Sequence, residues 1–197
     1  TFGSGLPDHE TVVAHLEREL SGRITNRTVR CYNFGAGYYF STQERILFED
    51  LILSGSVPNL AIFIDGLNDF RPLDGFPEFT PSLHERMAPD SPFISPRPPA
   101  TDAERKTASE WVLQRCQRNF RLVAGAAHQF GLRTVFVGQP VPFMEYPVNS
   151  TTYPFTQPNN DHRLCAFAYA RFAQLAATGA FGPDFIWAAD AFRDATV

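Results

Sequence analysis

The chain has 197 residues, of which 44% are hydrophobic, 14% aromatic and 19% charged. This composition predicts a folded globular protein, because disordered chains are poor in apolar residues and rich in charge, and the length suits one ordinary domain. The 17 Lys and Arg residues are outnumbered by 21 Asp and Glu residues, which gives a formal net charge of −4. Nucleic acid is therefore not an expected partner, and no apolar run approaches the roughly 18 residues of a membrane-spanning helix.

The three cysteines, Cys31, Cys116 and Cys165, are far apart in the sequence. Their odd number and their spacing argue against a disulfide framework and against a Cys-x-x-Cys metal site, so we expect buried free thiols. The His, Asp and Glu residues form no cluster with metal-ligand spacing either. Neither a metal nor another cofactor is expected.

The first forty residues predict one helix and one strand. Apolar residues recur at four-residue spacing between Asp8, a suitable N-cap, and Gly22, which predicts a helix. Residues 29–34 are rich in strand-forming side chains and are expected to form a short strand ahead of Gly35 and Gly37.

A second helix and a buried strand follow. Ser41 and Glu44 have the spacing of a capping box, so a helix is predicted from Ser41 to Gly55. Residues 60–64 are an unbroken apolar run, which is typical of a parallel strand covered by helices on both faces. The run ends in a polar turn at residues 65–69.

Proline interrupts the regular pattern between Arg71 and Pro99, where eight of the 16 prolines lie. So many prolines exclude a helix or a central strand, and we expect an insert at about residues 71–100. Because it leaves the sheet edge that carries Asn68, it is a candidate specificity loop, with a plain surface insert as the alternative.

Helix and strand alternate again after this insert. Thr101 and Glu104 form a second capping box, at the start of a helix that ends before Gly131. The later expected elements are a strand at 134–137, a loop at 139–160, a helix at 161–178 and a strand at 185–189. This alternation is typical of βαβ units and predicts an α/β protein with a parallel sheet.

Two of the predicted strand ends, residues 33–37 and 66–69, carry groups suited to binding an anion. Glycine after a strand lets backbone N–H groups come close to an anion, and an asparagine amide is a second donor. Ligands bind at the carboxyl ends of strands in open α/β sheets, so the two segments together have the parts of an oxyanion hole. Each segment by itself is also consistent with a simple turn. A dinucleotide fingerprint fails at Phe40, where the third glycine or an alanine would stand.

In their order and spacing these segments resemble the SGNH/GDSL hydrolases, in the branch whose first block is Gly-Gly-Ser-Thr-Thr-Phe-Gly. Residues 1–11 are similar to the sequence that directly follows the nucleophile in that block. Residues 33–44 resemble the second block and residues 64–69 the third. The likeness covers residues 1 to about 70, and the remainder only by its alternation of elements.

The resemblance implies a flavodoxin-like three-layer α/β/α fold with a parallel sheet, and a serine esterase acting on small-molecule, lipid or glycan esters. In such an enzyme serine attacks the ester carbonyl, histidine transfers the proton and aspartate orients the imidazole. Gly37 and Asn68 match the positions of the family's oxyanion donors. The family's glycine often stands one place later, so the backbone amide of Tyr38 is the alternative to that of Gly37.

The family's nucleophile and its Asp-x-x-His pair have no match in the chain. By the alignment, the serine and the first strand would precede Thr1 and the pair would follow Val197, so residues 1–197 are expected to be a single-domain fragment without activity. Ser4 is rejected as a substitute, because a nucleophile elbow needs a strand before it. A non-catalytic ligand-binding module on the same fold is the alternative function, and a flavodoxin-type nucleotide or flavin protein has poor support.

The other acidic and histidine residues are assigned structural roles. Asp190 and Asp194 follow the last predicted strand without a histidine three places on and are expected to be surface carboxylates. Asp161 and His162 lie at a predicted helix start, where negative charge is favourable. The remaining histidines are His84 in the proline-rich insert and His9, His15 and His128 on predicted helices.

Overall fold

The computed structural model describes residues 6–37, 39–70, 99–141 and 163–191. The chain divides into two compact units, Thr1–Tyr39 and Phe40–Val197. We describe each unit by itself.

The first unit holds a short 3-10 helix, η1 (Asp8–Glu10), and one α-helix, α1 (Val12–Arg23). The N-cap of α1 is Thr11 and not Asp8 as predicted, since Thr11 Oγ1 accepts a hydrogen bond from the amide of Ala14 at 3.2 Å. Asp8 begins the 3-10 turn instead, and its carbonyl accepts from the Thr11 hydroxyl at 2.9 Å. The extra turn therefore moves the cap three residues along the chain.

The strand predicted at residues 29–34 is not present. Residues 28–36 have no regular secondary structure, and the side chains of Tyr32 and Phe34 are exposed. A strand needs neighbouring N–H and C=O groups to pair with, and the described part of this unit contains no other strand. Strand-forming residues without a partner do not make a strand.

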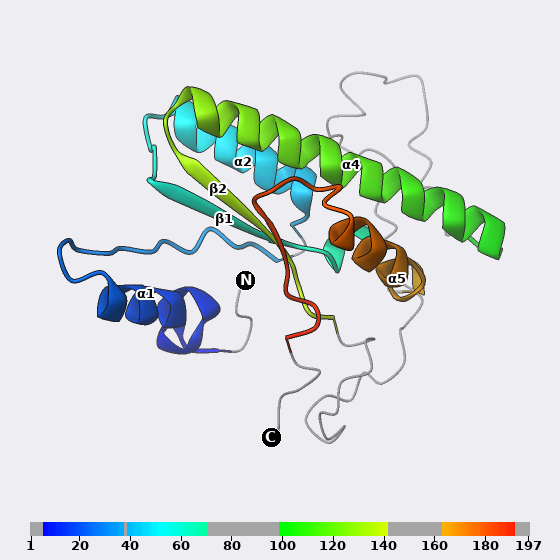
Figure 1. The fold of residues 1–197 in the computed structure, drawn as a ribbon, viewed down its shortest axis with the longest axis horizontal. Helices are drawn as coiled ribbons and strands as arrows, with labels where there is room; N and C mark the ends of the chain where they lie inside the picture. Colours follow the sequence, from blue (N-terminus) through cyan, green and yellow to red (C-terminus); the bar gives the residue numbers. More distant parts are fainter. Residues whose placement is uncertain (1–5, 38, 71–98, 142–162, 192–197) are drawn as a thin grey trace, which may run out of the picture. The chain divides into compact units, whose positions relative to one another are not determined.

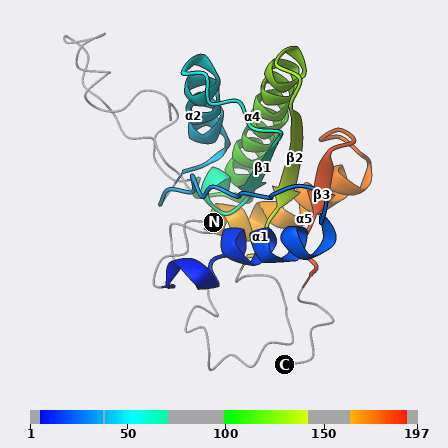
Figure 2. The ribbon, with the colours of Figure 1, turned by 90° about the vertical axis from the view of Figure 1, so that its left-hand side faces the viewer.

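The second unit is built on a three-stranded parallel sheet in the order β1-β2-β3. Figure 1 shows β1 beside β2, and Figure 2 labels β3 as well. Its strands are β1 (Leu60–Asp65), β2 (Arg133–Gly138) and β3 (Phe185–Trp187). The predicted α/β class with a parallel sheet is confirmed. The last strand ends at Trp187 rather than at residue 189.

Three helices accompany the sheet: α2 (Ser41–Leu53), α4 (Asp102–Gln129) and α5 (Arg163–Ala177). The capping box at the start of α4 is confirmed, because Thr101 Oγ1 accepts from the amide of Glu104 at 3.2 Å and the Glu104 carboxylate accepts from the amide of Thr101 at 2.9 Å. The helices predicted at residues 41–55, 101–131 and 161–178 are present in the described residues as α2, α4 and α5.

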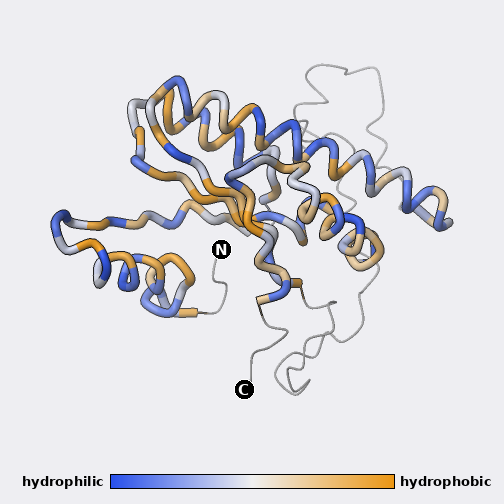
Figure 3. Tube along the Cα trace, in the orientation of Figure 1, coloured by the Kyte–Doolittle hydropathy of each residue, from blue (hydrophilic) through white to orange (hydrophobic). Residues whose placement is uncertain are grey.

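All three helices lie on the same face of the sheet (Figure 2). They pack on it through phenylalanine rings. Neighbouring phenylalanines of the three strands are in register on this face. The ring pairs, with their centroid distances, are Phe48 of α2 with Phe63 at 5.4 Å, Phe120 of α4 with Phe136 at 4.4 Å, and Phe172 of α5 with Phe185 at 5.8 Å. The sheet-facing sides of the helices and the strands form the apolar core (Figure 3).

The opposite face of the sheet carries β-branched side chains that stay accessible. Ile62 is 38% exposed and Ile186 is 54% exposed. Within the described residues of this unit no helix lies on that face. The sequence of residues 60–64 predicts helices on both faces of the sheet. In the described part of this unit, helices cover one face.

None of the described helices is long and apolar enough to cross a bilayer.

Candidate functional site

The candidate site begins at the carboxyl end of β1. The strand ends at Asp65, the chain turns at Gly66 and Leu67, and a short 3-10 helix, η2 (Asn68–Phe70), follows. Gly66 has a φ of +146°, and a Cβ atom at this position would overlap the hydroxyl of Tyr169. That hydroxyl is fixed by donating to the carbonyl of Gln139 at 2.9 Å. Residue 66 must therefore be glycine, because its φ is positive and because a side chain would overlap Tyr169.

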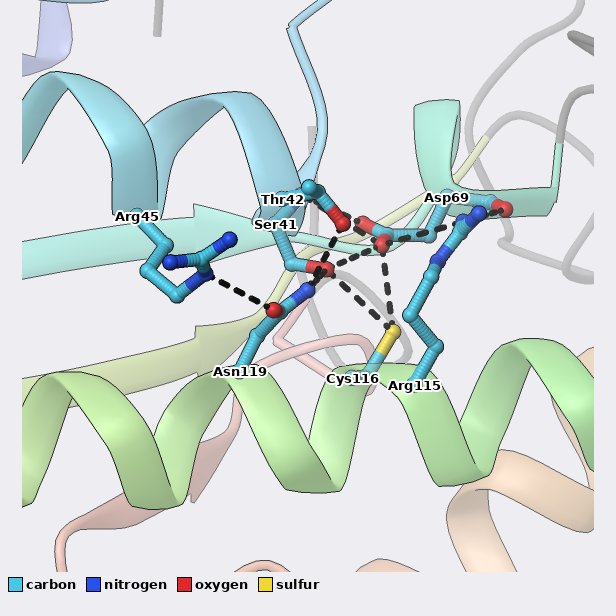
Figure 4. Close-up of polar contacts among 7 residues, drawn as sticks. All are labelled: Ser41, Thr42, Arg45, Asp69, Arg115, Cys116 and Asn119. Atoms are coloured by element: carbon cyan, nitrogen blue, oxygen red, sulfur yellow. Dashed lines mark hydrogen bonds and ion pairs between the residues drawn. The ribbon is translucent and has the colours of Figure 1, made fainter. Parts of the chain in front are cut away.

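The carboxylate of Asp69, directly after Asn68, is the centre of a buried polar network (Figure 4). Asp69 is 1% exposed. Its Oδ1 accepts from the Ser41 hydroxyl at 2.6 Å and from the Cys116 thiol at 3.1 Å, and its two oxygens lie 3.3 and 3.4 Å from the amide of Ser41. These contacts join the turn after β1 to the first residue of α2 and to α4.

The capping box predicted at Ser41 and Glu44 does not form. The N-cap position of α2 is Phe40, which has no side-chain acceptor, and Ser41 is the first helical residue. Asp69, which is distant in the sequence, supplies the missing acceptor. Its carboxylate accepts hydrogen bonds from both the amide and the hydroxyl of Ser41. A negative charge at a helix N-terminus is also favoured by the helix dipole.

Asn119 extends the network from Asp69 along α4. Its Nδ2 donates to the hydroxyl oxygens of Ser41 at 3.0 Å and Thr42 at 2.9 Å, and its Oδ1 accepts from Arg45 Nε at 3.2 Å. Arg45 also forms an ion pair with Glu49 at 2.8 Å. The start of α2 is therefore fixed to α4 by side chains whose polar groups are paired.

Arg115 of α4 holds the backbone of the same turn. Its guanidinium donates to the carbonyl of Asp69 at 2.9 Å and lies 3.8 Å from Oδ1 of that residue. The guanidinium also stacks between the rings of Phe40 and Trp111, at 4.9 Å from each centroid. The stacking orients this cation against the buried carboxylate.

Two further carboxyl groups face Asp69. Asp65 is 4% exposed, and no N–H or O–H donor of the described residues reaches its carboxyl oxygens. Burial raises the pKa of Asp65 well above its usual range, and the charges of Glu44 and Asp69 and a hydrogen bond to Asp69 raise it further. Burial and the charge of Asp69 also raise the pKa of Glu44 to about 7. The cluster therefore retains protons near neutral pH.

The structure places the two expected oxyanion donors in different units. Asn68 is half-buried and begins η2, next to the anchored Asp69. Gly37 lies in a turn of the first unit with open space beside its Cα. Tyr38, the alternative to Gly37, and the rejected Ser4 lie outside the described residues.

The remaining predicted residues are distributed over the fold. His9 lies in η1, His15 in α1 and His128 in α4. The surface position expected for Asp190 is wrong, since this residue is half-buried and its carboxylate accepts from Trp187 Nε1 at 2.9 Å. The indole N–H of Trp187, three residues before Asp190, donates a hydrogen bond to this carboxylate and keeps it away from the surface. His84, His162, Asp161, Asp194 and most of residues 71–100 and 139–160 lie outside the described residues.

The sequence did not reveal the anchoring role of Asp69 or of its partners on α4. Cys116 and Asn119 were hidden in the apolar pattern of a long helix, although their spacing of three residues puts both on one helix face. Cys116 and Cys165 are buried free thiols as predicted, whereas Cys31 is half-buried.

The described residues contain no group of three or more His, Cys, Asp or Glu side chains placed to hold a metal ion. A pocket of about 370 Å³ lies near Leu60 and Arg133, the first residues of β1 and β2. It is lined also by His128 and Asp184. This pocket is at the amino ends of the strands, the opposite end from Asn68.

The contacts of Asp69 restrain the turn at the carboxyl end of β1, and with it the backbone at Asn68. An amide side chain that is held in place can stabilise negative charge on a ligand oxygen. Comparison of the chain with protein-family models, with curated proteins and with solved structures finds no match.

Proposed function

We propose that this chain is the oxyanion-binding part of a serine ester hydrolase of the SGNH/GDSL type. The observation that supports this most is the anchored turn after β1, where Asn68 stands between Gly66, which must be glycine, and the buried Asp69. A donor lowers the barrier of acyl transfer only when it is held in place before the reaction. The backbone at Asn68 is restrained by β1 on one side and, on the other, by the contacts of Asp69 with α2 and α4.

The second donor in this proposal is the backbone amide of Gly37 or of Tyr38. This donor is part of the proposal because the resemblance to the family implies it.

The chemistry follows from these donors and from groups supplied by sequence outside the chain. A serine hydroxyl attacks the ester carbonyl carbon while its proton passes to histidine, and the carbonyl oxygen becomes an oxyanion. Asn68 and the backbone amide donate to that oxygen. The C–O bond to the alcohol then breaks, histidine returns the proton to the leaving alcohol, and water releases the acyl group from serine. No cofactor takes part.

The proposal includes the flavodoxin-like three-layer fold. The accessible side chains Ile62 and Ile186 provide an apolar face suited to a second layer of helices. β1 has a neighbour on one side only in the described sheet, so its other edge can pair with a further strand. Both features agree with the fold that the resemblance implies.

The test is hydrolysis of a nitrophenyl ester by the isolated chain and by the chain extended with its flanking coding sequence. We expect serine-dependent hydrolysis by the extended protein, abolished by a serine-directed inhibitor, and none by the isolated chain. Binding of ester ligands without hydrolysis by the extended protein would favour a non-catalytic module. Hydrolysis by the isolated chain that Ser4→Ala abolishes would place the nucleophile at Ser4.

A further inference from the structure

We propose that the carboxyl groups of Asp65 and Asp69 share one proton, carried by Asp65, and that this pair positions Asn68. The pairing concerns only the described residues, whereas the role in oxyanion binding rests on the proposed function. The two aspartates bracket the turn: Asp65 is the last residue of β1 and Asp69 is the second residue of η2.

The hydrogen bonds around the two carboxyl groups are unequal. Asp69 receives the hydroxyl and amide of Ser41 and the thiol of Cys116, and Arg115 lies 3.8 Å away. Asp65 is equally buried but receives no donor from the described residues. A buried carboxylate without donors is costly, while a protonated carboxyl can donate to its neighbour. The proton therefore belongs on Asp65 and the charge on Asp69.

The charges on the surrounding elements favour the same state. Glu44 of α2 adds a third carboxyl group, and among the described residues Arg115 of α4 places a cation 3.8 Å from Asp69. Ionising every carboxyl group would leave an excess of negative charge in a buried place, which is unfavourable. The neighbouring thiols, Cys116 of α4 and Cys165 of α5, stay protonated because burial and the charge of Asp69 raise the pKa of each.

The shared proton closes the turn that carries Asn68. A hydrogen bond from Asp65 to Asp69 joins residues on either side of Gly66, Leu67 and Asn68, so it fixes the direction in which Asn68 leaves the backbone. Loss of that proton would place two negative charges at the two ends of the turn and push them apart. Asp65 and Asp69 are thus positioning residues, which act through Asn68.

Reciprocal asparagine variants of the isolated chain test the pairing. In Asp65→Asn the amide N–H replaces the carboxyl O–H as donor to Asp69, so we expect the urea midpoint to stay near that of the unchanged chain. In Asp69→Asn the negative charge is lost and one carboxylate oxygen becomes an NH2 group that cannot accept a hydrogen bond from Asp65, so we expect a much lower midpoint. In a Glu44→Gln background, Asp65→Asn should also remove the remaining fall of stability with rising pH. Equal destabilisation by the two variants would overturn the pairing.

Carbon-13 NMR of the aspartate carboxyl groups reads the proton directly. At neutral pH we expect one aspartate carboxyl resonance at the chemical shift of a protonated carboxyl group. We expect Asp65→Asn to remove this resonance. Titration of Asp65 near its ordinary pKa of about 3.9 would refute the shared proton.

Ester hydrolysis by the extended protein tests the positioning. We expect Asp69→Asn to lower kcat by about 100-fold with KM changed by less than about threefold, the effect of a displaced catalytic group. Should that variant not fold, Asp65→Leu, which has the same number and branching of heavy atoms but cannot donate, should lower kcat while Asp65→Asn does not. Equal kcat values for Asp65→Leu and Asp65→Asn would refute positioning. Absence of hydrolysis by the unchanged extended protein would overturn the proposed function and the positioning with it, but not the NMR result.

Discussion

The hydroxyl of Ser41 donates to the carboxylate of Asp69 over 2.6 Å and joins the first turn of α2 to the turn that follows β1. The two residues are 28 positions apart in the sequence. This contact gives α2 the acceptor that its N-cap residue, Phe40, does not have. The same carboxylate therefore starts a helix and anchors the residue next to Asn68.

Asp69→Ala should destabilise the chain by about 3 kcal/mol, because it leaves buried donors without their acceptor. Urea unfolding followed by circular dichroism measures the change. The control is Asp50→Ala, an exposed position on α2, which should change the free energy of unfolding by less than about 0.5 kcal/mol. Equal effects of the two variants would show that the network contributes nothing.

Gly66→Ala should also destabilise, by about 2 kcal/mol or more, because residue 66 has a positive φ and the new methyl group meets the Tyr169 hydroxyl. The double variant with Tyr169→Phe should recover part of this loss. Gly125→Ala, in the interior of α4 with open space around it, should instead stabilise by about 0.5–1 kcal/mol. A Gly66→Ala variant as stable as the parent chain would contradict the close contact.

The raised pKa of Glu44 predicts that the chain loses stability as the pH rises. The ordinary pKa of this carboxyl is 4.5 and its folded pKa is about 7. Glu44 therefore binds more proton in the folded state between these values, so its contribution to the free energy of unfolding is fully present below pH 4.5 and is lost as the pH rises through about 7. Glu44→Gln should remove about 2–3 kcal/mol of this fall. Urea midpoints measured across this range test it, and an unchanged pH dependence in the variant would contradict the burial of a protonated Glu44.

The three cysteines should differ in their reactivity toward a thiol reagent. Burial raises the pKa of all three thiols, and the charge of Glu17 raises that of Cys31 further, but Cys31 is only half-buried, whereas Cys116 and Cys165 are buried and closed to a reagent. Because the thiolate is the reactive form, one thiol should react in the folded chain and the other two only on unfolding. Cys31→Ser should abolish the early reaction. Early labelling of that variant would mean that the core around Asp69 opens readily.

Much of the second unit could be predicted from local sequence. Apolar runs and periodic apolar residues predicted β1, β2, α2, α4 and α5, and the Thr101 capping box was confirmed because both of its partners are local. The features that could not be predicted depend on distant partners. The strand expected at 29–34 has no neighbour to pair with in the described part of its unit, and Ser41 bonds to Asp69 rather than capping its own helix.

The candidate site was predictable in part for the same reason. Asn68 was singled out by its place after an apolar strand, which needs only the local sequence. Its support by Asp69, Cys116 and Asn119 depends on how α2 and α4 meet, which no local pattern specifies. Asp65 was part of the polar turn, but that no described residue donates to its carboxyl group appears only once the surrounding side chains are placed.

The most direct test of the proposed esterase is the turnover of an ester substrate by the Asn68→Ala variant of the extended protein. Asn59→Ala, an exposed position just before the amino end of β1, is the matched control. We predict that Asn68→Ala lowers kcat by about 10²–10³-fold, the cost of one lost oxyanion donor, while Asn59→Ala stays within about threefold of the parent protein. A kcat for Asn68→Ala within about threefold of the parent would contradict the assignment of Asn68 to the oxyanion hole.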